Sequence, residues 1–124
     1  MQEHAMSIYK LFQIQLTDQE VDIINKANDH NTVPKNIARI KLGMACKDND
    51  CSMLVKDSFA KNYFSHVANI TAATLEGVFH TGNIGPEENI ERLKPMHSVS
   101  VGDVIEDTVD GRLWIVADFG FQEV

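Results

Sequence analysis

The chain has 124 residues, the length of one domain, and 44% of them are hydrophobic and 23% charged. A chain of this size and composition can bury about two-thirds of its extended surface in one core, which excludes overall disorder and fibrous repeats. Eighteen acidic against eleven basic residues give a formal net charge of −7. This balance argues against direct binding of nucleic acid, because basic clusters supply most of the affinity for phosphates.

The uncharged segments are too short to cross a membrane. The longest, residues 62–75, also contains Asn, Ser, His and Thr, whereas a spanning helix needs about 20 mostly apolar residues. A secretion signal begins with basic residues, and an apolar stretch follows them. The first ten residues show neither feature. We therefore expect a cytosolic protein that contacts no membrane.

The two cysteines, Cys46 and Cys51, flank the polar segment KDND. In a reducing cytosol we expect two free thiols there rather than a structural disulfide. A zinc site would need two further ligands, and no two histidines have a spacing such as H-x3-H. The Asp-x-Asp pattern of KDND also lacks the glycine and the closing glutamate of a calcium loop. We predict no metal and no cofactor.

The first half of the chain, residues 7–62, begins with a predicted strand and a capped helix. Apolar residues alternate with Gln13 and Gln15, the period of two of a half-buried strand whose glutamines lie on the polar face. Thr17 then opens the sequence TDQE, a capping box. The first helix should run from about 18 to 28.

Two more helices are predicted before the first half ends. Pro34 suits the first turn of a helix because proline has no amide to satisfy there, and apolar residues continue at helical spacing from Ile37 to Met44. Val55 and Phe59 lie one turn apart and predict a short third helix.

The second half, residues 63–124, opens with a similar pattern. YFSHVANI predicts a strand, Thr71 is the predicted cap of the next helix, and Gly82 suits a left-handed helix end. A shift of 54 positions superposes Thr17 on Thr71 and indicates two related strand–helix units. Because any strand that leads into a Thr-capped helix has this pattern, duplication and coincidence both stay open.

The chain closes with a predicted antiparallel hairpin. Its strands are residues 98–106 and 112–121, joined by DTVDG, in which Asp110-Gly111 can supply the positive backbone angles of a tight connection. In the first strand, Gly102-Asp103 predicts a bulge or bend rather than a catalytic site. Glycine tolerates angles closed to valine, and the aspartate can bond a neighbouring amide.

These elements predict one α+β domain with the order β-α-α-α-β-α-β-β. We expect a small mixed or antiparallel sheet, helices packed on one of its faces, and the C-terminal hairpin. The strand and three helices of residues 7–62 would form one half, and residues 63–124 the other.

No segment carries a catalytic or cofactor motif. G-x-S-x-G, P-loop, G-x-G-x-x-G and H-E-x-x-H patterns are absent from the sequence, so we predict no catalytic residue and no enzyme. The segment HTGNIGPEEN, residues 80–89, is rich in Gly and Asn. Its backbone amides can bind an anion, or the segment can serve as a constrained connection.

This segment and the terminal hairpin together form the predicted interaction surface. Aromatic residues near a sheet edge can anchor a partner or belong to the core, and an edge hairpin can pair with a second copy to give a homodimer. The candidate residues are Asn83, Ile84, Gly85, Glu87, Glu88, Arg92, Asp103, Trp114, Phe119 and Phe121.

Residues 63–124 resemble a group of small proteins of tailed bacteriophages, notably phages of marine bacteria and cyanobacteria. The shared pattern includes Val67-Ala68-Asn69, Leu75-Glu76-x-Val78-Phe79, Asn83-Ile84-Gly85, Arg92-Leu93, the run from Ser98 to Val104, and Gly120-Phe121. The resemblance implies a phage accessory protein in the cytoplasm of an infected bacterium. It carries over no catalytic residue, because none is assigned in that group.

Three functional hypotheses follow for this chain. The first is a non-catalytic accessory protein that binds a host or phage protein, in a host-takeover or inhibitor role. The second is a small-ligand or anion-binding module that uses the loop from Asn83 to Glu88. The third is an acidic mimic of nucleic acid that occupies a basic groove on its target.

Overall fold

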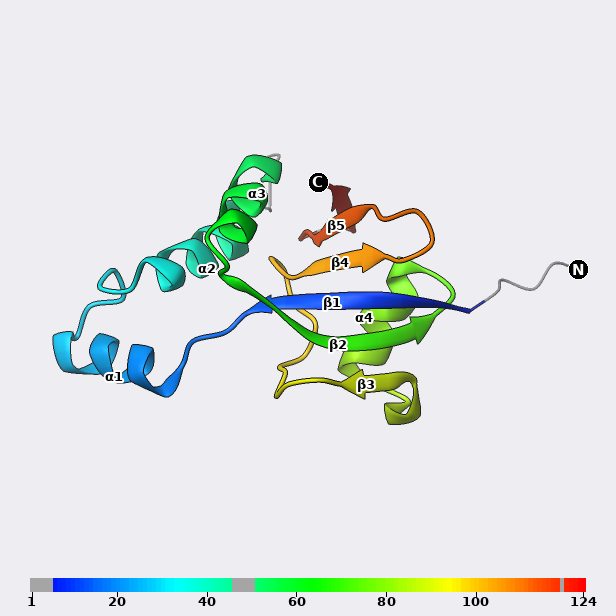
Figure 1. Ribbon diagram of the computed structural model, residues 1–124, viewed down its shortest axis with the longest axis horizontal. Helices are drawn as coiled ribbons and strands as arrows, with labels where there is room; N and C mark the ends of the chain where they lie inside the picture. The colour runs from blue at the N-terminus through cyan, green and yellow to red at the C-terminus, as the bar shows by residue number, and fades with distance from the viewer. Residues whose placement is uncertain (1–5, 46–50, 119) are drawn as a thin grey trace, which may run out of the picture.

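The computed structural model describes residues 6–45, 51–118 and 120–124, and it confirms a single α+β domain. The elements run β1 (Ser7–Ile14), α1 (Asp18–Ala27), α2 (Pro34–Ala45), α3 (Ser52–Ala60), β2 (Phe64–Ala72), α4 (Leu75–Asn83), a 3-10 turn (Glu87–Asn89), β3 (Ile90–Arg92), β4 (Val104–Asp107), β5 (Leu113–Val116) and β6 (Phe121–Glu123). Figure 1 shows α1, α2 and α3 beyond one end of the sheet and α4 behind the strands.

The six strands form one antiparallel sheet in the order β3-β2-β1-β4-β5-β6. The first strand of the chain therefore lies in the middle. Tyr9 of β1 faces Ile70 of β2 on one side and Asp107 of β4 on the other. The two predicted halves thus share a single sheet, since β1 pairs only with strands from the second half.

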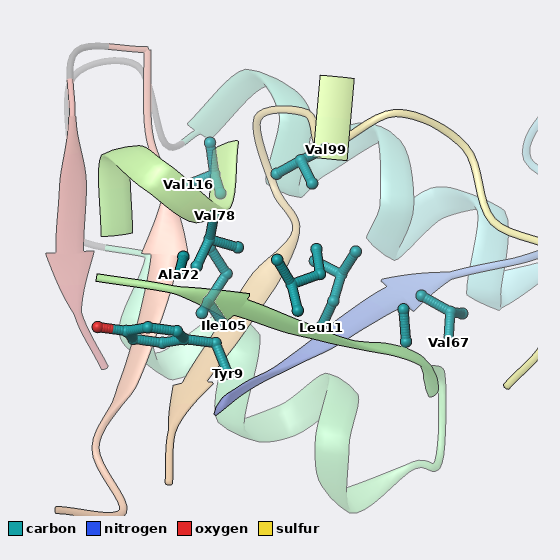
Figure 2. Packing of buried hydrophobic residues seen from close by; sticks show 10 residues of the cluster. Tyr9, Leu11, Val67, Ala72, Val78, Val99, Ile105 and Val116 are labelled. Carbon is teal, nitrogen blue, oxygen red and sulfur yellow. The ribbon is translucent and has the colours of Figure 1, made fainter. Parts of the chain in front are cut away.

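One face of the sheet is covered by α4. Tyr9 and Leu11 of β1 pack there with Val67 of β2 and Val78 of α4, and Figure 2 shows these side chains together between the strands and the helix. Val99, which belongs to no strand, completes this layer from the segment after β3.

At one end of the sheet, α2 and α3 pack against the other face. Ile14 of β1 packs there with Leu42 of α2 and Val55 of α3, and the rings of Phe12 and Phe59 meet edge to face with centroids 5.3 Å apart. The expectation of helices on one face is therefore wrong. Consecutive residues of the central strands are buried, such as Val104 and Ile105, so both faces need a cover.

The helix starts were predictable where the signal was local. The capping box of α1 is confirmed, because the Glu20 amide donates to Thr17 Oγ1 at 3.1 Å and the Thr17 amide to Glu20 Oε1 at 2.8 Å. The cap of α4 is Thr74 and not Thr71. Thr71 remains in β2, opposite Ile8 of β1, so the 54-residue shift aligns a helix cap with a strand residue.

Residues 97–103, which we call the crossing loop, are not the predicted strand, because β4 begins only at Val104. The alternation of Val99 and Val101 has a different cause. Val99 packs in the α4 layer and Val101 against the α2–α3 layer. The crossing loop therefore passes from one layer to the other at the end of the sheet.

Two glycines allow the crossing loop to lie close to both helices. A Cβ on Gly82 of α4 would stand 2.2 Å from Cγ2 of Val99. Gly102 has a φ of +95°, and its Cβ would lie 3.3 Å from the Gly43 amide nitrogen of α2. The predicted bend at Gly102-Asp103 is confirmed, since the Asp103 amide donates to the Ser100 carbonyl at 3.0 Å.

The terminal hairpin is confirmed, with strands β4 and β5 that are shorter than predicted. The additional strand β6 pairs antiparallel with β5 and forms a second hairpin. Gly111 has a φ of +74°, as expected of its connection.

Cys51 is buried and disulfide-bonded, so the expectation of a free thiol at this position is wrong. Cys46 lies outside the described residues. Within the described ranges, no helix is long and apolar enough to span a membrane.

Candidate functional site

A cleft of about 590 Å³ lies between α2 and the crossing loop. This volume falls in the range of small-molecule sites, roughly 300 to 1,000 Å³. A second hollow of about 560 Å³ adjoins it and shares Ile14, Arg39 and His97. The residues that line the first cleft include Ile14 of β1, Arg39 and Leu42 of α2, and His97, Val101 and Asp103 of the loop.

Gln13 of β1 fixes the crossing loop from beneath. Its side chain is fully buried, and Nε2 donates to Asp103 Oδ2 at 3.0 Å and to the His97 carbonyl at 2.9 Å. The His97 amide donates in return to Gln13 Oε1 at 3.2 Å. If the Gln13 amide were flipped, its oxygen would face two other acceptors, Asp103 Oδ2 and the His97 carbonyl. The network therefore fixes which side-chain atom of Gln13 is the nitrogen and which is the oxygen.

Asp103 is the buried carboxyl of the cleft, with 5% of its surface exposed. Oδ2 accepts from the Ser100 amide at 2.9 Å and from Gln13. Within the described residues Oδ1 has no hydrogen-bond partner, and the residue lines the cleft. Burial raises the pKa of Asp103 to about 6, against the opposing effects of the Ser100 amide, His97 and Gln13.

His97 lies at the entrance of the cleft, on the boundary with the second hollow. Its Nδ1 lies 2.8 Å from the Ser98 carbonyl oxygen, which only accepts, and 3.2 Å from Gln13 Nε2, so Nδ1 donates to that carbonyl. The Ser100 hydroxyl likewise donates to the Ser98 carbonyl at 2.9 Å. The His97 ring and the Ser100 hydroxyl therefore share the Ser98 carbonyl as a partner, and no hydrogen bond joins them to each other among the described residues.

Arg39 is held in place by a residue of its own helix. Nε and Nη2 donate to Asn36 Oδ1 at 3.1 and 2.9 Å, and the buried Asn36 donates in turn to the His30 carbonyl at 3.0 Å. Arg92 and Arg112 form ion pairs with acidic residues. Among the described carboxylates, Arg39 pairs with none, which leaves its remaining N–H groups for a ligand.

The predicted loop from Asn83 to Glu88 is fastened to the rest of the fold. Asn83 Nδ2 donates to the Val99 carbonyl at 3.1 Å, and Arg92 Nη2 pairs with Glu87 Oε1 at 2.7 Å. After Pro86 the chain forms a single 3-10 turn, Glu87–Asn89. Gly85 has a positive φ of +118°, and Ile84 projects from the loop with 79% of its surface exposed.

The other predicted interaction residues lie elsewhere. Trp114 of β5 is half-buried, and Phe121 of β6 packs against the α4 layer. Phe121 also lines a groove of about 260 Å³ together with Glu76, Phe79 and Asp118. Phe119 lies outside the described residues. Asp103 lines the cleft beside α2 and Phe121 lines this groove, so the predicted surface is divided among separate places.

Sequence reasoning did not select Gln13, Arg39 or His97 as site residues. The spacing of Gln13 predicted a polar-face residue, and His97 is 84 positions away from Gln13 in the chain. No local pattern marks such a contact. In comparisons with known proteins, the chain matches no protein-family model, no curated protein and no solved structure.

Proposed function

We propose that this chain is a non-catalytic binding module that takes a small polar ligand into the cleft at Asp103. The observation that supports the proposal is the buried carboxyl itself. Its Oδ2 is held by Gln13 and Ser100, while Oδ1 has no partner among the described groups. Because Oδ1 faces the cleft, a ligand that donates a hydrogen bond can reach it without breaking a bond inside the protein.

The arrangement favours binding over catalysis. Nucleophilic catalysis needs a base within hydrogen-bond reach of the nucleophile. Here the Ser100 hydroxyl and His97 Nδ1 both bond the Ser98 carbonyl, and Gln13 stands between His97 and Asp103. The hydrogen bonds of Gln13, His97 and Ser100 hold the crossing loop in place, and they leave Asp103 Oδ1 facing the cleft.

A thermal-shift screen of small polar molecules at pH 7.5 tests the proposal. A ligand at 100 times its dissociation constant should stabilise the protein by about 2.7 kcal/mol. Gly43→Leu is the matched control, because a Cβ on this cleft residue meets no atom within 4 Å. The leucine should fill the cleft without disturbing α2 and should abolish the shift.

Two results would contradict the ligand proposal. One is a library without any stabilising molecule. The other is a set of hits that stabilise wild type and Gly43→Leu equally, since these molecules would bind outside the cleft.

A second candidate function is binding of a partner protein, in the setting of a phage accessory protein. The groove between α4 and the terminal strands favours it. Phe79, 41% exposed, and Phe121 supply its apolar surface, and Glu76 and Asp118 line it with carboxylates. Because the chain carries a net charge of −7, we expect a partner segment that joins an apolar side chain to lysine or arginine.

Selection from a displayed peptide library tests this second function. Wild type should enrich peptides with a basic and apolar consensus, and Phe79→Ala should lose them. Val109→Ala, which alters an exposed residue of the β4–β5 turn, is the control and should retain them. Equal enrichment on Phe79→Ala, or a consensus without basic residues, would contradict the assignment of the groove.

A further inference from the structure

The cleft presents two groups of opposite charge that differ in how they are held. Asp103 is buried, and its free oxygen Oδ1 belongs to a carboxyl fixed by two donors. Arg39 is at the surface, and Asn36 holds one edge of its guanidinium through two hydrogen bonds. Both side chains line the same cleft.

Each group selects one kind of ligand atom. A carboxylate oxygen accepts from an ammonium group, and a guanidinium donates to a carboxylate. A ligand with only one charge would pair with only one of these groups and would leave the other to water, so it would gain less from the cleft than a ligand with both charges. A ligand that carries one positive and one negative charge satisfies both.

The remaining wall of the cleft is aliphatic. Ile14 and Leu42 are buried core residues that line it, and Val101 is half-buried beside them. Contact with an apolar part of a ligand removes further apolar surface from water, about 25 cal/mol for each square ångström. The ligand should therefore also have an uncharged, apolar part.

We propose that the ligand is a free amino acid with an aliphatic side chain, whose ammonium group binds Asp103 and whose carboxylate binds Arg39. This inference rests on the proposed ligand-binding function and names the chemical class of the ligand. The aliphatic side chain lies against Ile14, Leu42 and Val101.

Isothermal titration with each of the twenty L-amino acids at pH 7.5 tests the inference. The tightest binder is then replaced by its N-acetyl form, which lacks the ammonium group, and by its carboxamide, which lacks the carboxylate. Each analogue should bind wild type about 10- to 100-fold more weakly, the worth of one hydrogen bond to a charged group.

Two variants assign the two charges. Asp103→Asn retains an oxygen acceptor for Ser100 and Gln13 and removes the negative charge. It should bind the amino acid no better than the N-acetyl form, yet still prefer the amino acid to the carboxamide. Arg39→Gln should show the converse pattern. It should bind the amino acid no better than the carboxamide, yet still prefer the amino acid to the N-acetyl form.

The possible failures are distinguishable. If either analogue binds wild type as tightly as the parent amino acid, the two-charge assignment is overturned. If no amino acid binds while other molecules give shifts that Gly43→Leu abolishes, the ligand class is wrong and the binding function stands. If neither the amino acids nor the library binds, both proposals fail.

Discussion

Replacing Asp103 by asparagine should stabilise the protein above pH 6. The carboxyl is ionised at neutral pH although only 5% of its surface is exposed. Asparagine has the same shape, its oxygen can accept from the Ser100 amide and from Gln13 as Oδ2 does, and its NH₂ group can occupy the position of Oδ1 at the cleft. The substitution removes the buried charge and keeps the two hydrogen bonds.

The magnitude follows from the pKa of Asp103. Burial raises the pKa from its ordinary value of 3.8 to about 6, and one pH unit corresponds to about 1.4 kcal/mol. The folded state therefore holds the proton more tightly than the unfolded state. Stability from this group is complete below pH 4 and falls by about 3 kcal/mol as the pH rises through 6.

Urea unfolding of wild type and Asp103→Asn between pH 3.5 and 8 measures this difference. The free energies of unfolding should diverge in favour of the variant between pH 4 and 6 and run parallel above. Other carboxyls contribute equally to both proteins and cancel. Asp22→Asn, at an exposed position of α1, should show no such divergence. A difference between wild type and Asp103→Asn that does not change with pH would refute the argument.

Further substitutions test the packing of the helices and the crossing loop. Gly82→Ala should destabilise the fold by about 1 to 3 kcal/mol, because its Cβ would lie 2.2 Å from Val99. Gly43→Ala, whose Cβ would meet no atom within 4 Å, should raise the free energy of unfolding by up to about 1 kcal/mol. Thermal unfolding of both variants measures the contrast, and equal shifts in melting temperature would contradict it. Gly102→Ala should cost about 1 to 3 kcal/mol because its φ is +95°, and an unchanged melting temperature would show that the loop adapts. Ser58→Ala should raise stability by about 1 kcal/mol, since the buried Ser58 hydroxyl has no partner among the described residues; calorimetry measures it, and a loss would mean that the hydroxyl is satisfied.

The sequence was sufficient where the determining contacts are local. The capping box at Thr17, the helix start at Pro34 and the turn at Gly111 each depend on residues within a few positions. It misled where a local pattern had a tertiary cause. Val99 and Val101 alternate as in a strand, but they pack in two different layers, and periodicity alone does not separate these cases.

The site depended on a contact that no local rule supplies. Gln13 has the spacing of a solvent-facing strand residue, yet it is buried because it bonds Asp103, 90 positions further along the chain. Its polar side chain is stable there only because the loop provides both acceptors and a donor. The bend at Asp103 was therefore predictable, and its burial beside a cleft was not.

The central place of β1 has a consequence for how the chain folds. Tyr9 pairs with Ile70 and with Asp107, so the middle strand can find its second neighbour only after nearly a hundred further residues have been synthesised. Contacts of such long sequence separation carry a large loop-closure entropy and slow folding. Until β4 arrives, one edge of β1 stays open to other chains, and the nascent protein is at that stage most exposed to aggregation.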